Sequence, residues 1–108
     1  MGISGARYSD HVGGFAEELV GELGALGDLS WKKMFGGAGI FVDGSMFALI
    51  NSDAELHLKV DDSNRAQFEA TGTERHARMP YYAVPADIPE DREQLLGWAA
   101  GSARIARS

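Results

Sequence analysis

The stretch 34-MFGGAGIFVDGSMFALI-50 decides the fold of this chain. Glycines crowd its first half, and an almost unbroken apolar run fills its second half. Between two apolar arms stands Asp43-Gly44, a strong hairpin signal because a type I′ turn needs positive φ at both central residues. The sequence therefore predicts a β-hairpin with arms over 39–42 and 45–51. We expect the preceding glycines to allow a bulge or a close backbone approach at a bend in the sheet.

Three binding interpretations of the same stretch fail on spacing or context. A P-loop needs G-x-x-x-x-G-K-[ST] running into a helix, whereas no lysine follows Gly39 and the next residues are strand-like. A dinucleotide-binding G-x-G-x-x-G pattern fails because Val42 stands where the third glycine would fall. An RNA-recognition motif needs a strand with a second aromatic motif before the first helix, and neither is present. Phe35, Phe41 and Phe47 are therefore expected to pack in the core or on the sheet.

Hydrophobic periodicity and turn residues predict the remaining elements. These are an amphipathic helix over 8–26, strands over 31–35 and 56–60, a short helix within 61–72, candidate strands over 74–78 and 80–84, and a last helix over 91–106. The order α-β(3–4)-α-β(2)-α contains no βαβ alternation. It predicts an α+β fold in which helices pack on an antiparallel sheet.

Length and composition indicate one globular domain. The chain has 108 residues, 44% of them hydrophobic and 24% charged, which is ordinary for a soluble protein. We assign residues 1–7 as a disordered lead or a cloning remnant and residues 8–108 as the domain. No stretch has the length of a membrane span, no secretory signal is recognisable, and the chain has no cysteine, so we expect a cytoplasmic protein.

The three histidines do not form a recognisable metal or catalytic motif. His11, His57 and His76 fall on three different predicted elements without the short spacing of zinc ligands. In the strand over 56–60, His57 alternates with Leu56 and Leu58, and we expect its side chain to be solvated.

The paired carboxylates have a structural explanation. Asp61-Asp62 and Glu90-Asp91 both stand at predicted helix starts, where acidic residues cap the helix or favour its dipole. No G-x-S-x-G motif surrounds Ser45. We therefore predict no catalytic residue, no metal and no cofactor, with a site assembled from distant residues as an open alternative.

The charge balance disfavours nucleic-acid binding, although a local basic patch is an alternative. The formal net charge is −6, whereas duplex binding draws much of its affinity from Lys and Arg on phosphates. A basic patch would form if the strands that carry Lys32, Lys33, Arg75 and Arg78 were neighbours. A homodimer is a further alternative, because an edge strand with Tyr81 and Tyr82 could pair with a second copy.

The chain resembles the TfoX N-terminal domain family, also called the Sxy or competence-regulator family. The resemblance rests on "KKMFGGAGIFVDGSMFALI", then "LHLKVDD", the short helix with Phe68, "MPYYAVP" and "LLGWAAGSA", in the order of the family. The motif positions that carry over are Met34, Phe35, Gly36, Gly37, Gly39, Asp43, Gly44 and Phe47, all with structural roles.

The resemblance implies both a fold and a role. The fold is a curved antiparallel sheet with helices on one side, similar to type III secretion chaperones. The role is regulation of natural competence genes together with a transcription activator, without a catalytic residue. We therefore expect a non-enzymatic protein-interaction domain whose protein partner is a transcription factor, with a nucleic-acid-binding domain and a small-ligand or enzymatic domain as the alternatives.

Overall fold

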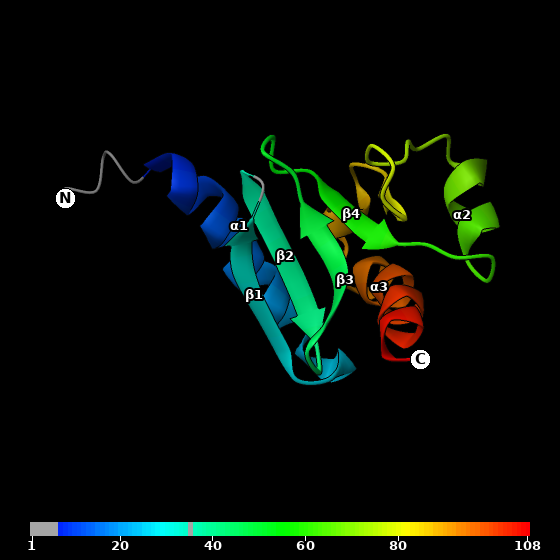
Figure 1. The fold of residues 1–108 in the computed structure, drawn as a ribbon, viewed down its shortest axis with the longest axis horizontal. Coiled ribbons are helices and arrows are strands. Elements are labelled where there is room, and N and C mark those ends of the chain that lie inside the picture. Colours follow the sequence, from blue (N-terminus) through cyan, green and yellow to red (C-terminus); the bar gives the residue numbers. More distant parts are fainter. Residues whose placement is uncertain (1–6, 35) are drawn as a thin grey trace.

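A five-stranded antiparallel sheet forms the centre of the protein, in the order β1-β2-β3-β4-β5. A computed structural model describes residues 7–34 and 36–108, with side chains from His11 onward. The elements are α1 (Arg7–Glu22), the 3-10 turn η2 (Gly24–Leu26), β1 (Leu29–Met34), β2 (Gly37–Val42), β3 (Ser45–Ile50), β4 (Leu56–Lys59), α2 (Arg65–Ala70), β5 (Tyr81–Ala83), the 3-10 turn η3 (Ile88–Glu90) and α3 (Arg92–Arg107). Among the described residues this is an α+β fold, and the predicted fold class is confirmed (Figure 1).

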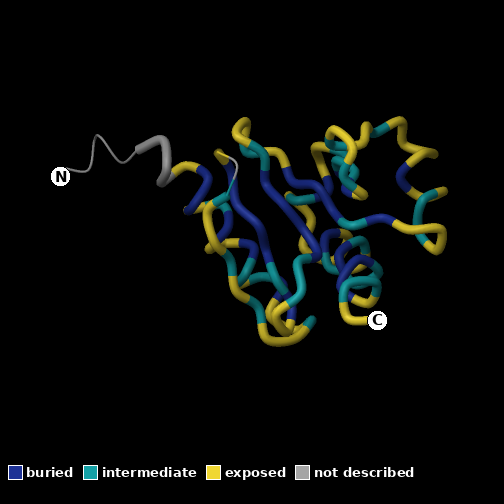
Figure 2. The backbone as a smooth tube through the Cα atoms, in the orientation of Figure 1, coloured by how far each residue is buried: buried dark blue, intermediate teal, exposed yellow. Residues whose placement is uncertain are grey.

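The two long helices cover the same face of the sheet. α1 packs against β1 and β2, whereas α3 packs against β3 and β4. The buried side chains follow the predicted periodicities, with Ala16 and Leu19 from α1 meeting Ile40 and Ile50 from the central strands in one core. Figure 2 shows this buried band running along the central strands and the inner side of α3.

The hairpin at Asp43-Gly44 is confirmed. Asp43 has φ of 50° and Gly44 has φ of 88°, as a type I′ turn requires. Ile40 pairs with Ala48 on β3, whereas Phe41 pairs with Met46. The register therefore shifts by one residue at a bulge between Ile40 and Phe41. Phe47 is the extra residue of the bulge, and its side chain is fully buried.

The glycines before the hairpin make a second turn and a close backbone contact. β1 and β2 are antiparallel neighbours joined across Gly36, which has φ of 77°, so β1 does not simply continue into β2. A Cβ atom on Gly37 would lie 1.8 Å from the carbonyl oxygen of Ile50. The prediction of a glycine-dependent close approach is therefore confirmed, while Phe35 lies outside the described residues.

One predicted strand and the predicted end of the first helix are wrong. The segment over 74–78 is no strand, since only Arg75 bridges to Tyr82. The first helix ends at Glu22, and the 3-10 turn η2 continues to Leu26. Glycines inside the helical pattern offer no side chain to hold a longer regular helix.

The predicted caps of the two later helices have different outcomes. The N-cap of α2 is Asn64 without a side-chain cap bond, and Asp61 instead accepts from the Ser63 amide at 2.7 Å within the preceding turn. At α3, Asp91 caps as predicted, accepting from the backbone amides of Glu93 and Gln94. A hydrogen bond from the side chain of Gln94 is the largest cause that lowers the pKa of the Asp91 carboxyl, and a hydrogen bond from the backbone amide of Gln94 is the second.

Replacing Gly37 with alanine will destabilise the fold. The new methyl would overlap the backbone of Ile50, so we expect Gly37→Ala to lower the free energy of unfolding by about 1–3 kcal/mol or more. Gly97→Ala on α3 is the control, because nothing lies within 4 Å of its added Cβ. That change should stabilise by up to about 1 kcal/mol. Urea unfolding followed by circular dichroism measures both, and equal effects would contradict the close-contact interpretation.

Candidate protein-binding groove

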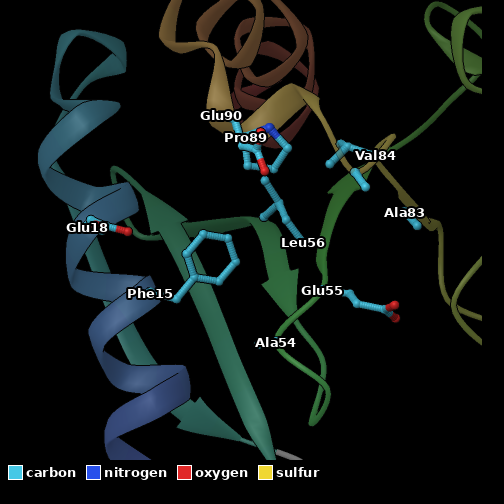
Figure 3. A pocket seen from close by; sticks show the side chains of 10 residues that line it. Phe15, Glu18, Ala54, Glu55, Leu56, Ala83, Val84, Pro89 and Glu90 are labelled. Carbon is cyan, nitrogen blue, oxygen red and sulfur yellow. The ribbon is translucent and has the colours of Figure 1, made fainter.

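A groove lies on the helix-covered side of the sheet, between α1 and the segments that surround β4 and β5 (Figure 3). Its volume is about 410 Å³. The residues that line it are Phe15, Glu18, Ala54, Glu55, Leu56, Ala83, Val84, Ala86, Pro89 and Glu90. They come from α1, the turn before β4, the end of β5 and η3, so only the folded chain brings them together.

The floor of the groove is apolar. Phe15 is half-buried on α1, and Figure 3 shows its ring projecting toward Leu56 at the start of β4. Leu56 and Val84 are buried, and the Val84 amide donates to the Leu56 carbonyl at 3.1 Å. This backbone bond holds the floor residues side by side, and Pro89 completes the floor from η3.

Carboxylates stand at the edges of the groove. Glu18 lines it from α1, and Glu90 lines it from η3 on the other wall. Glu55 is engaged at the turn, where one of its carboxylate oxygens accepts from Asn51 Nδ2 at 2.9 Å. The described lining residues include no lysine or arginine, so this part of the groove is acidic around an apolar floor.

A second hollow extends the groove along α1. It has a volume of about 660 Å³ and is lined by His11, Gly14, Phe15, Glu18, Asp53 and Ala54. Phe15, Glu18 and Ala54 line both hollows. The two hollows therefore make one elongated depression, and we call their combined lining the α1 groove.

The structure does not bring the four predicted basic residues together. Lys32 and Lys33 lie on β1 at one edge of the sheet, and they point to opposite faces. Arg75 bridges to Tyr82 on β5, at the other edge. Four strand spacings of about 4.8 Å separate β1 from β5 by roughly 19 Å. The predicted basic patch required the segments that carry these residues to be neighbours. Lys32 and Arg75 lie at opposite edges of the sheet, and Arg78 lies in the same connecting segment as Arg75.

The edge of β5 is already occupied. Its outward carbonyl at Tyr81 accepts from the His76 amide at 2.7 Å, and its outward amide at Ala83 donates to the Glu74 backbone carbonyl at 3.0 Å. A second copy pairing along β5 would have to displace both bonds. Tyr82 instead packs its ring 6.0 Å from that of Phe68.

Tyr81 and the motif residues have structural contacts. The hydroxyl of Tyr81 donates to the Met46 carbonyl at 3.1 Å, and burial raises the pKa of this hydroxyl. Asp43 accepts from the Asp28 amide at 3.1 Å and lies 3.9 Å from Arg107 on α3. A Cβ atom on Gly39 would lie 2.8 Å from the sulfur atom of Met34.

The expectation of a solvated His57 is wrong. His57 is only 5% exposed, and Leu56, His57 and Leu58 are all buried, so burial does not alternate along β4 as predicted. Its Nδ1 donates to the Glu55 carbonyl at 3.0 Å, and its ring packs edge-on against His76 with centroids 5.0 Å apart. Burial chiefly lowers the pKa of His57 below 6.5, helped by the charge of His76 and opposed by Glu55.

The buried His57 predicts a loss of stability in acid. Because its folded pKa is depressed, the unfolded chain binds the proton first as the pH falls through 6.5. The free energy of unfolding should therefore decline between about pH 7.5 and about pH 5.5, and decline less in His57→Gln. Exposed His11→Gln is the control for replacing a histidine with glutamine. Urea titrations at the two pH values test this, and equal slopes in His57→Gln and the parent would contradict it.

Sequence reasoning missed the α1 groove because its residues have ordinary explanations one by one. Phe15 belongs to the apolar stripe of the first helix, and Leu56 to a regular strand pattern. Only the contact between distant segments makes them the floor of a depression. Among the described residues, no group of three or more His, Asp or Glu side chains could hold a metal ion.

The fold and the comparisons agree on the class of this domain. Four strands, a short helix, one strand and a long helix follow α1, as in a small α+β domain. The chain belongs to the TfoX N-terminal domain family, whose model matches residues 22–106. No curated protein matches the chain. None of the helices in the described part is long and apolar enough to cross a membrane. His11, Gly14, Phe15 and Glu18 precede the matched residues, so the wall of the α1 groove that α1 contributes lies outside the family match.

Proposed function

We propose that this chain is a non-enzymatic, cytoplasmic protein-interaction domain that takes part in regulating transcription. The observation that carries the proposal is the α1 groove, an elongated depression with a half-buried aromatic ring on its apolar floor. Membership of the TfoX N-terminal domain family supports the regulatory part of the proposal. The partner is a transcription factor, as the resemblance to competence regulators implies.

The shape of the groove favours a polypeptide segment over a compact ligand. Two hollows of about 410 and 660 Å³ adjoin along α1 and share three lining residues. Small-molecule sites enclose most of the surface of their ligand with a few converging polar groups. Here the polar side chains are four carboxylates and His11, and they are spread along the length of the groove. An extended or helical segment with one bulky apolar side chain can place that side chain beside Phe15 and Leu56.

Blocking the groove should abolish capture of the partner. Ala86 lines the groove and is exposed, so Ala86→Trp places an indole in the space that the partner segment needs. Ala66→Trp on α2 is the matched control, because Ala66 is exposed and lines neither hollow. Affinity capture from lysate of the source cells, with and without nuclease treatment and at low and moderate salt, compares the parent with both variants by mass spectrometry. A captured transcription factor should be lost with Ala86→Trp and retained with Ala66→Trp.

The captured protein must then bind the purified domain in calorimetry, with the same dependence on the two variants. A captured set that is identical for parent and Ala86→Trp would contradict the proposal. Recovery of material only in the arm without nuclease, and only at low salt, would favour the nucleic-acid alternative instead.

A further inference from the structure

We infer that the segment bound in the α1 groove is basic, with lysine or arginine on both sides of one bulky apolar residue. This inference rests on the proposed function and specifies the chemistry of the partner. The apolar side chain lies on the floor formed by Phe15, Leu56, Val84 and Pro89. The cations face Glu18 on one wall and Glu90 on the other.

The charged side chains described in the groove, histidine aside, are all acidic. Glu18, Asp53, Glu55 and Glu90 line the two hollows, and no lysine or arginine lines either of them among the side chains described from His11 onward. A cleft of one charge sign with low-dielectric walls focuses the potential and attracts ligands of the opposite charge. The negative groove is therefore complementary to a cationic segment.

No described lysine or arginine forms an ion pair with a carboxylate of the α1 groove. The two ion pairs of the described residues are Arg65 with Asp62 and Arg107 with Asp43, both away from the groove. Arg107 also donates to the Leu26 carbonyl at 2.9 Å. Neither ion pair compensates the carboxylates of the α1 groove.

Desolvation strengthens the preference for cations. A segment that covers the apolar floor removes water from the carboxylates beside it. Desolvation of an unpaired carboxylate is unfavourable and is therefore a loss of binding free energy. Lysine or arginine on the segment compensates this loss by pairing with Glu18 and Glu90, whereas an acidic segment adds repulsion. Electrostatic complementarity of this kind discriminates between partners even where each exposed pair contributes little affinity.

The test is selection of a random peptide library displayed on phage against the immobilised domain. Glu18→Gln with Glu90→Gln removes two charges from the walls and leaves Glu55, which is bonded to Asn51, in place. Glu69→Gln with Glu74→Gln is the matched control, because both residues are exposed and line neither hollow. Ala86→Trp reports whether a selected peptide uses the groove at all.

We expect the selected peptides to place lysine or arginine on both sides of a bulky apolar residue. Their affinity should fall by about threefold to tenfold in the Glu18/Glu90 variant, as expected for two partly exposed pairs, and stay unchanged in the Glu69/Glu74 variant. Peptides that are neutral or acidic but still blocked by Ala86→Trp would overturn this inference and leave the proposed function standing. Selected peptides that Ala86→Trp does not affect would contradict both.

Discussion

The contact between Gly37 and the backbone of Ile50 is the constraint on which the rest of the sheet depends. A side chain at position 37 would meet the Ile50 carbonyl at 1.8 Å, so β2 and the end of β3 can approach only because this residue is glycine. That approach aligns Ala38 with Ile50, and the bulge at Phe47 absorbs the extra residue nearer the hairpin. The register of the two central strands sets where β3 ends and where the turn into β4 begins.

The same turn forms one side of the α1 groove. Asn51 organises it, since its side-chain oxygen accepts from the amides of Asp53 and Glu55 at 3.0 and 2.9 Å. Ala54 adopts φ of 63° within it, and Leu56 then enters β4 facing the core. α1 passes opposite this turn and contributes Phe15. The depression therefore exists because the short turn and η3 leave part of the apolar face of the sheet beside α1 uncovered.

Much of the fold could be predicted from the sequence, and the groove could not. Asp43-Gly44 has one favoured backbone conformation, and the period-two pattern from Leu56 to Lys59 fixes a strand, so local rules suffice there. The prediction of a strand over 74–78 was wrong because that segment forms a single β-bridge, at Arg75. His57 misled for a related reason: alternation gives the face of a side chain but not what covers that face, and here His76 lies against it. The groove depends on distances between α1 and segments about 40 residues or more away, which no local pattern encodes.

The most direct test of the account is where a ligand contacts the folded domain. Amide chemical shifts of the ¹⁵N-labelled protein, followed during titration with the best-binding selected peptide, report this residue by residue. The account predicts that the perturbed amides cluster at Phe15, Glu18, Leu56 and Val84 on the helix-covered side. Perturbations confined to the other face of the sheet, around Lys32 and Phe41, would contradict the assignment of the α1 groove as the binding site.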